Sequence, residues 1–340
     1  MIPSEKSAAV TRSLREAFGV TTFEEIREID KGRTLALVYR IVVQGTPYLL
    51  RIISDLQMRM ISPVRQFTCM QIVAEAGIAP RVHYASIEDG ISITDFVEEV
   101  PFAAAEALVR MPTLLRALHG LPAFPKGTDA FDTSAMFLLH KGAGLDGFFQ
   151  TFQAKNILAK AEGEQLVAWH AQLAAVYPQN DGDMVSSHND LFKPDNILFD
   201  GNRVWLVDWE AAFLNDRYAD LAVVANQLVS DDVDEKLYLE RYFGQPPDEY
   251  QLARFFLMQQ IVHIFYAVGF LLLGSAGALN PNEKAADFKA FNRRFWSGEI
   301  NLVDKEMKTA YGFAHWDQLS KNMQRPERFT EALRIVAAGH

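Results

Sequence analysis

The chain has little cysteine and little positive charge. Cys69 is its single cysteine, which excludes an internal disulfide and a cysteine zinc site, so we expect a reducing compartment and a cytoplasmic location. The 340 residues carry 33 Lys and Arg against 43 Asp and Glu, a formal net charge of −10. Because a protein that grips nucleic acid needs clustered cations to neutralise phosphates, we expect no nucleic-acid partner. A cationic ligand fits this charge better.

Long apolar runs are also scarce. Residues 255–279 form one uncharged stretch long enough to span a membrane. Gln259, Gln260 and His263 interrupt it, and the sequence holds no second such stretch to pack against it. We therefore expect a buried helix of a large helical lobe and no membrane partner, with a lipid span as the alternative. The N-terminal segment lacks the apolar core of a secretory signal and predicts a helix ending near Gly19.

The remaining patterns divide the chain into two lobes, as its length favours. The β-type runs of the first part are residues 23–30, 35–43, 47–54, 81–87 and 91–97. Ser62-Pro63 predicts the start of one helix between them, which Gly77 ends. After Pro101 helical periodicity dominates. We predict an α+β fold: an N-terminal lobe over residues 1–96, a small antiparallel sheet with one main helix, and a mainly helical C-terminal lobe over residues 97–340.

One segment, HNDLFKPDNILFDGNRVWLVDWE at residues 188–210, carries the chemistry. Its two apolar runs flank Gly201-Asn202 and predict a tight hairpin. Residues equidistant from such a turn face each other, so we expect Asn196 and Asp208 about 5 Å apart, with Asp190 on the loop before them. An amide oxygen and a carboxylate suit Mg²⁺, and a further carboxylate can accept a proton.

Each of these residue types is common at turns, where Asp and Asn bond their own backbone. Their combination on one hairpin, two residues after His188, instead favours phosphoryl transfer, which depends on positioning and electrostatic stabilisation. A metal-dependent hydrolase using His188 and Asp190 is a weaker alternative, because further His or Asp ligands at recognisable spacing are missing from the sequence.

At these residues the chain resembles the aminoglycoside phosphotransferase and choline kinase family, a branch of the protein-kinase-like fold. The His-x-Asp, Asn and Asp-Trp-Glu elements of that family correspond here to His188, Asp190, Asn196 and residues 208–210. The resemblance extends in the right order from about residue 30 to 270, through three further segments: residues 76–84, 114–125 and 215–222. The start of the motif and its Asp-Trp-Glu element are closest to bacterial choline-kinase-like members.

The resemblance implies an ATP-dependent small-molecule kinase that uses Mg²⁺. It makes Asp190 the base or orienter of the acceptor hydroxyl, and Asn196 and Asp208 the magnesium ligands. It assigns Arg51 to the nucleotide phosphates and Gly32 to a glycine loop that cradles them. It also implies a structural role for His188, which would brace the catalytic loop.

The sequence departs from the family in three places. Five residues separate Asp190 from Asn196 where the family has four, so the loop carries one extra residue around Phe192 or Lys193. Gly32 is the one glycine of residues 31–39, where the family often has two. The helix after Ser62 has only Glu75, at its end, as an acid, so Arg51 lacks an obvious partner. We hypothesise that a guanidinium, which stays charged without a partner, makes that ion pair less necessary.

The acceptor is the least defined part. Acids near the catalytic loop and aromatics in the last third predict a pocket for a small ammonium alcohol such as choline or ethanolamine; these residues are Asp195, Glu210, Asp216, Asp220, Tyr266, Phe291, Trp296, Tyr311 and Trp316. Aromatics at helical spacing are more often core than cage, and we expect core for most of these five. Alternatives are a kinase of an aminoglycoside, thiamine, homoserine or another small alcohol, and a nucleotide-binding pseudokinase without turnover. The sequence leaves the oligomeric state open.

Overall fold

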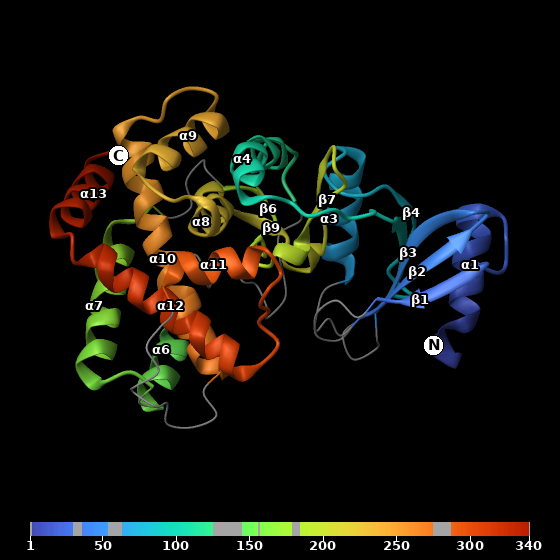
Figure 1. Cartoon of the computed structure of the whole chain (residues 1–340), viewed down its shortest axis with the longest axis horizontal. Helices are drawn as coiled ribbons and strands as arrows, with labels where there is room; N and C mark the ends of the chain where they lie inside the picture. The colour runs from blue at the N-terminus through green and yellow to red at the C-terminus, as the bar shows by residue number, and fades with distance from the viewer. Residues whose placement is uncertain are drawn as a thin grey trace.

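The structure, a computed structural model, describes residues 2–29, 36–53, 63–124, 145–155, 157–178, 184–274 and 287–339. Figure 1 shows two lobes along the long axis of the molecule, a sheet with few helices at one end and a bundle of helices at the other. This is the predicted α+β architecture. Gly32 lies outside the described residues.

The N-terminal lobe is built on a five-stranded sheet in the order β1-β2-β3-β5-β4, with antiparallel neighbours throughout. Its strands are β1 (Glu25–Glu28), β2 (Leu37–Val43), β3 (Thr46–Ile52), β4 (Val82–Ser86) and β5 (Ile91–Asp95). A tight turn joins β2 to β3, where Gly45 has φ 75°, a left-handed conformation that favours glycine. The helices before the sheet are η1 (Ser4–Lys6) and α1 (Ser7–Phe18). The second of these ends at Gly19, as predicted.

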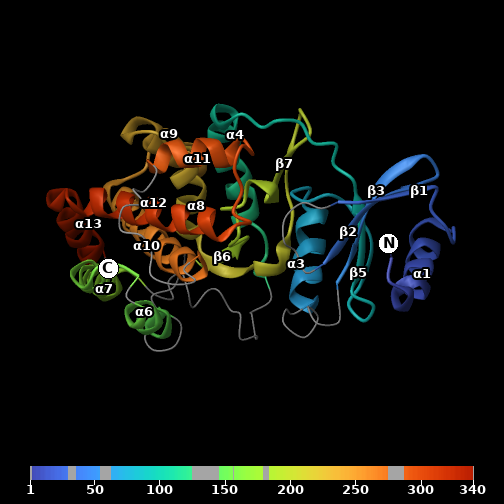
Figure 2. The same cartoon turned by 60° about the horizontal axis from the view of Figure 1, so that its bottom comes forward.

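Alternation along β3 determines which side chains face the C-terminal lobe. Leu50 and Ile52 are buried in one apolar cluster with Val10 and Leu14 of α1. Successive side chains of a strand point to opposite faces, so Arg51 projects from the face away from α1. Figures 1 and 2 show α1 on the outer side of the sheet, so Arg51 points toward the C-terminal lobe.

Helix α3 (Pro63–Glu75) is the predicted helix of the N-terminal part, and it connects the two lobes. Figure 2 shows it between the sheet and the helical lobe. Its buried residues Cys69 and Val73 belong to the apolar core of the C-terminal lobe rather than to that of the sheet. We propose a lobe boundary near residue 96, because β5 ends at Asp95 and helix α4 begins at Ala104.

The C-terminal lobe is mainly helical. Its helices are α4 (Ala104–His119), α6 (Leu145–Ala154), α7 (Lys160–Val176), α8 (Arg217–Leu228), α9 (Asp232–Phe243), α10 (Glu249–Gly274), α11 (Phe288–Trp296), α12 (Lys305–Met323) and α13 (Pro326–Ala338). Its short strands are β6 (Met184–Ser187), which pairs with β9 (Phe213–Asp216), and β7 (Ile197–Phe199), which pairs with β8 (Val204–Leu206). The 3₁₀ turns η2 (Pro194–Asn196) and η3 (Trp209–Ala211) flank this last pair.

Helix α10 contains most of the apolar stretch that could have spanned a membrane. Within the described part of the chain it is the one helix long and apolar enough to do so, yet 78% of its most apolar window is buried inside the protein. Phe255, Leu257 and Ile261 on this helix belong to the core of the lobe. This agrees with the expected buried helix.

Candidate active site

The predicted hairpin is present as β7 and β8. Ile197 pairs with Leu206, and the chain turns at Gly201-Asn202 as expected. The carboxylate of Asp200 stabilises the turn by accepting hydrogen bonds from the backbone N–H groups of Asn202 (2.8 Å) and Arg203 (2.7 Å). This turn brings the two ends of the segment together.

The expected facing of Asn196 and Asp208 is wrong by one residue. Asn196 lies opposite Val207, whose backbone N–H donates to the Asn196 carbonyl at 3.0 Å. Asp208 comes one residue later and has φ 67° and ψ 70°, a left-handed conformation that costs free energy in a residue other than glycine. Backbone strain of this kind clusters at functional sites.

Asp190 is held by two neighbours in its own loop. Its Oδ2 accepts hydrogen bonds from Lys193 Nζ (2.6 Å) and Asn196 Nδ2 (3.0 Å), and its carbonyl accepts a second bond from Asn196 Nδ2 (2.8 Å). Burial raises the pKa of the Asp190 carboxyl, and the Lys193 ammonium only partly offsets this. Asp190 is therefore a fixed carboxylate of enhanced basicity, as a proton acceptor requires.

Asn196 and Asp208 each keep one oxygen for a further ligand. Asn196 uses its side-chain nitrogen toward Asp190, and Asp208 uses Oδ1 to accept from Arg51 Nη1 at 2.9 Å. Among the described residues, no donor contacts Asn196 Oδ1 or Asp208 Oδ2. Burial acts to raise the pKa of Asp208, but Arg51 and Lys193 overcome it and hold the pKa below its usual value. An ionised carboxylate and an amide oxygen fit a hard cation that takes its remaining ligands from water and phosphate.

Asp220 of α8 stabilises the loop that carries Asp190. The Asp220 carboxylate accepts hydrogen bonds from the backbone N–H groups of His188 and Asn189, both at 2.8 Å. His119 Nε2 donates to the same carboxylate at 3.3 Å. His188 is fully buried and donates through Nε2 to the Val207 carbonyl at 2.9 Å. It therefore links the catalytic loop to the hairpin, which supports its predicted bracing role.

Arg51 has carboxylate partners, contrary to our hypothesis that it lacks one. In addition to Asp208, it donates through Nη2 to Glu210 Oε2 at 3.4 Å. Helix α3 contacts the same segment through the Arg65 guanidinium, which donates to the Glu210 carbonyl at 3.1 Å. The acid missing from the helix is thus replaced by one from η3. Burial, followed by the charge of Asp208, raises the pKa of Glu210 to about 7.

The extra residue of the catalytic loop has a clear location. Phe192 packs against Tyr266 and Phe270 of α10, with ring centroids 5.1 and 5.6 Å apart. The chain then turns so that Lys193 reaches back to Asp190. Sequence reasoning assigned no function to Lys193, and it placed Glu210 in the acceptor pocket rather than beside Arg51. The signals that could have found them were the cation inside the altered loop and the acid two residues after Asp208.

Two of the acids expected to line an acceptor pocket are internal. Asp216 accepts hydrogen bonds from Arg254 Nη2 (2.7 Å) and from the Tyr177 hydroxyl (2.9 Å), with both charges buried. Asp220 braces the catalytic loop, as described above. The prediction of an acidic pocket is therefore wrong for these two residues.

The aromatic side chains expected near the acceptor are mostly core, as we favoured. Tyr266, Phe291 and Tyr311 are buried in the apolar cluster of the C-terminal lobe, and Trp296 and Trp316 pack half-buried against it. In the described part of the chain, no group of three or more His, Cys, Asp or Glu side chains is arranged to hold a metal ion. The hydrolase alternative therefore gains no support.

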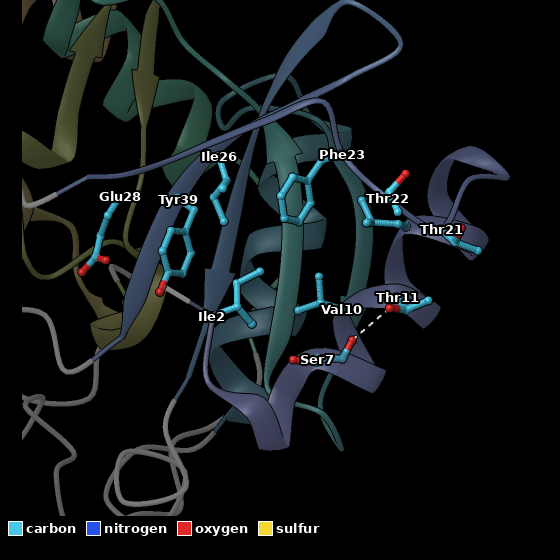
Figure 3. A pocket seen from close by; sticks show the side chains of 11 residues that line it. Ile2, Ser7, Val10, Thr11, Thr21, Thr22, Phe23, Ile26, Glu28 and Tyr39 are labelled. Atoms are coloured by element: carbon cyan, nitrogen blue, oxygen red, sulfur yellow. Dashed lines mark hydrogen bonds between the residues drawn. The ribbon is translucent and has the colours of Figure 1, made fainter.

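A cavity of about 510 Å³ lies elsewhere, between α1 and the strands β1 and β2 (Figure 3). Val10, Phe23, Ile26 and Tyr39 are among its lining residues. Tyr39 and Val10 belong to the apolar cluster on the α1 side of the sheet. Because Arg51 projects from the opposite face, this cavity is separate from the catalytic groups.

Comparisons with known proteins agree with this geometry. A sequence profile described as "Phosphotransferase enzyme family" matches residues 25–256, more than half of the chain. Curated protein sequences yield no match.

Several solved structures share the fold. A choline/ethanolamine kinase family protein from Mesorhizobium loti has a TM-score of 0.64 at 18% identity, over 98% of this chain and 99% of its own. Choline kinase LicA from Streptococcus pneumoniae has a TM-score of 0.59 at 13% identity, over 94% and 99%. A spectinomycin phosphotransferase, solved with ADP and spectinomycin, has a TM-score of 0.51 at 14% identity, over 91% and 98%. At these identities the likeness concerns the fold, and it confirms the predicted protein-kinase-like architecture.

Proposed function

The chain belongs to the phosphotransferase enzyme family, and we propose that it transfers the γ-phosphoryl group of ATP to the hydroxyl of a small cationic amino alcohol, such as choline or ethanolamine. One observation carries this proposal. Asp190 is a buried carboxylate that accepts a hydrogen bond from Asn196. Asp208 is a carboxylate that accepts a hydrogen bond from the cation Arg51. Asn196 and Asp208 each keep one oxygen that is unused among the described residues. A binding module without turnover has no need for the buried base.

Asp190 accepts the proton of the acceptor hydroxyl in this mechanism. Its carboxylate is fixed by Asn196, so the proton acceptor is already positioned before the substrate arrives. Burial raises its pKa, which brings the group closer to the pH at which proton transfer is most effective. Arg51 would bind phosphate oxygens of the nucleotide, and a guanidinium is well suited to this because its N–H groups form a planar fork.

Asn196 Oδ1 and Asp208 Oδ2 would hold Mg²⁺. When bound, the ion neutralises charge on the phosphate oxygens during transfer. The residues of this chain keep that pair of oxygens available: Asp190 binds the Asn196 nitrogen, and Arg51 binds the other oxygen of Asp208. Arg51 also keeps Asp208 ionised by lowering its pKa.

The choice of nucleotide and acceptor draws on the related structures. Two of them are described as complexes with AMP and with ADP, which supports an adenine nucleotide. Several are choline or ethanolamine kinases, and the net charge of −10 suits a cationic acceptor. The buried position of helix α10 supports a cytoplasmic enzyme.

Release of ADP in the presence of Mg²⁺, ATP and a panel of alcohols tests the proposal. The panel contains choline, ethanolamine, aminoglycosides, thiamine and homoserine, and Asp190→Asn is the matched control. We expect turnover with choline or ethanolamine and its loss in the variant. Turnover with only another alcohol of the panel would mean that this alcohol, rather than choline or ethanolamine, is the acceptor. Nucleotide binding without turnover on any alcohol would favour a pseudokinase.

A further inference from the structure

We propose that Lys193 is a catalytic residue whose ammonium contacts the γ-phosphoryl group as it is transferred. This inference rests on the proposed ATP-dependent reaction and adds a second cation to it, besides Arg51. It also gives a role to the additional residue in the catalytic loop. Three observations support it: the path of the loop, the charges around the ammonium and the hydrogen bonds by which Asn196 already holds the base.

The path of the loop places Lys193 beside the base. Phe192 fills a site among the aromatic rings of α10 and thereby anchors the loop in the C-terminal lobe. The ammonium of Lys193 lies over the Phe192 ring, 5.6 Å from its centroid, and comes within 2.6 Å of Asp190 Oδ2. The extra residue thus lets one side chain anchor the loop while the next supplies a cation at the reacting position.

The surroundings of the ammonium are those of a phosphate-binding cation. Three carboxylates act on Lys193, namely Asp190, Asp208 and Glu210, and their charges keep it protonated by raising its pKa despite burial. Its side chain is 41% exposed, so a ligand can reach it from solvent. An ammonium has three N–H donors, and among the described residues Lys193 uses one. The other two can bind phosphate oxygens.

A purely structural role does not account for the position of Lys193 next to Asp190. Asn196 already binds both the carbonyl and Oδ2 of Asp190, so the base is held without Lys193. The position of the cation next to the base is accounted for by the reaction, in which negative charge moves onto the transferred group.

The transfer step balances as follows. The acceptor O–H bond breaks and its proton goes to Asp190, while the hydroxyl oxygen forms a bond to the γ-phosphorus. The bond between that phosphorus and the bridging β,γ oxygen breaks, and ADP leaves with the electron pair. Lys193 remains protonated throughout. Its N–H groups bind equatorial oxygens of the phosphoryl group, while Asp190 gains the proton and loses its charge.

The test compares Lys193→Met with the exposed control Lys160→Met on α7, where the lysine side chain is 89% exposed. Affinities for ADP and for a non-hydrolysable ATP analogue are measured by calorimetry, together with kcat and KM. Because ADP lacks the γ-phosphate, Lys193→Met should bind ADP as the unsubstituted protein does and bind the analogue about 10- to 100-fold more weakly. Its kcat should fall about 100-fold or more, and Lys193→Arg should recover part of this loss. Lys160→Met should leave all four quantities unchanged.

Equal losses of ADP and analogue affinity, or an unchanged kcat, would overturn the proposal. If Lys193→Met does not fold, Lys193→Gln replaces it with the same expected difference between the two nucleotides. The binding comparison needs no acceptor, so it separates this inference from the proposed function. An unsubstituted protein that binds the analogue but phosphorylates no alcohol would refute the proposed function, while the nucleotide comparison would still decide the role of Lys193.

Discussion

Replacing Glu210 by glutamine should stabilise the ligand-free protein at alkaline pH and weaken its use of nucleotide. Burial and the nearby charge of Asp208 raise the pKa of Glu210 to about 7 from an ordinary value of 4.5. Between pH 4.5 and about pH 7 the folded protein therefore retains a proton at Glu210 that the unfolded chain has lost. Stability from this group is present at acid pH and declines as the pH rises through this range. Glutamine resembles the protonated form at every pH.

The magnitude follows from the shift. A difference of about 2.5 units at 1.36 kcal/mol per unit amounts to about 3 kcal/mol. By linkage, the free energy of unfolding of Glu210→Gln should exceed that of the unsubstituted protein by less than about 1 kcal/mol at pH 5 and by about 3 kcal/mol at pH 8. At about 2 °C per kcal/mol for a chain of this size, the melting temperature should rise by about 6 °C at pH 8.

Thermal and urea unfolding at pH 5 and pH 8 measure this, with a chelator present so that no divalent cation binds Asp208. Glu164→Gln, on the exposed surface of α7, is the matched control and should change the unfolding free energy by less than about 0.5 kcal/mol. The same Glu210→Gln variant should need several-fold more ATP, because Arg51 loses one of its two carboxylate partners. A variant that is less stable at pH 8, or a difference that does not grow with pH, would refute this reasoning.

Three further predictions follow from the buried charges. Asp190→Asn should lower turnover by about 10²- to 10⁴-fold in the ADP-release assay and leave the ADP affinity measured by calorimetry within about twofold. Turnover equal to that of the unsubstituted protein would refute the role of Asp190 as proton acceptor. Arg254→Met leaves Asp216 buried without its cation, which should cost about 3 to 5 kcal/mol in urea unfolding, and Asp216→Asn in the same chain should recover part of that. His263 is buried with its pKa lowered to about 3, so the free energy of unfolding should fall as the pH drops below 6.5. Between pH 7 and pH 5, His263→Leu should lose about 2 kcal/mol less of this free energy than the unsubstituted protein.

Local patterns predicted most of the elements. The turn at Gly201 and the end of α1 at Gly19 both occur where the sequence placed them. These features depend on backbone conformations that few residues adopt, so single positions reveal them. Asp190, Asn196 and Asp208 were predicted to cluster because a short hairpin leaves its two ends no other arrangement.

The same local reasoning missed the pairing of Asn196 by one residue. Asn196 ends the 3₁₀ turn η2, and Asp208 adopts a left-handed conformation before η3. Neither departure from an extended strand has a signal in side-chain type, because both depend on how the flanking segments pack. The extra loop residue was visible in the sequence, but the division of labour between Phe192 and Lys193 required the position of α10.

The sequence by itself predicted the α+β fold, because hydrophobic periodicity and turn chemistry act locally, and it indicated the family through the motifs of residues 188–210. Only the tertiary structure decided the partners of the charges: Glu210 for Arg51, Arg254 for Asp216 and Asp220 for the catalytic loop. Charged groups act through space, and each needs a counter-ion or a set of hydrogen bonds once it is buried. The chain can supply these from any element that folding brings within reach, so their position along the sequence is free to vary.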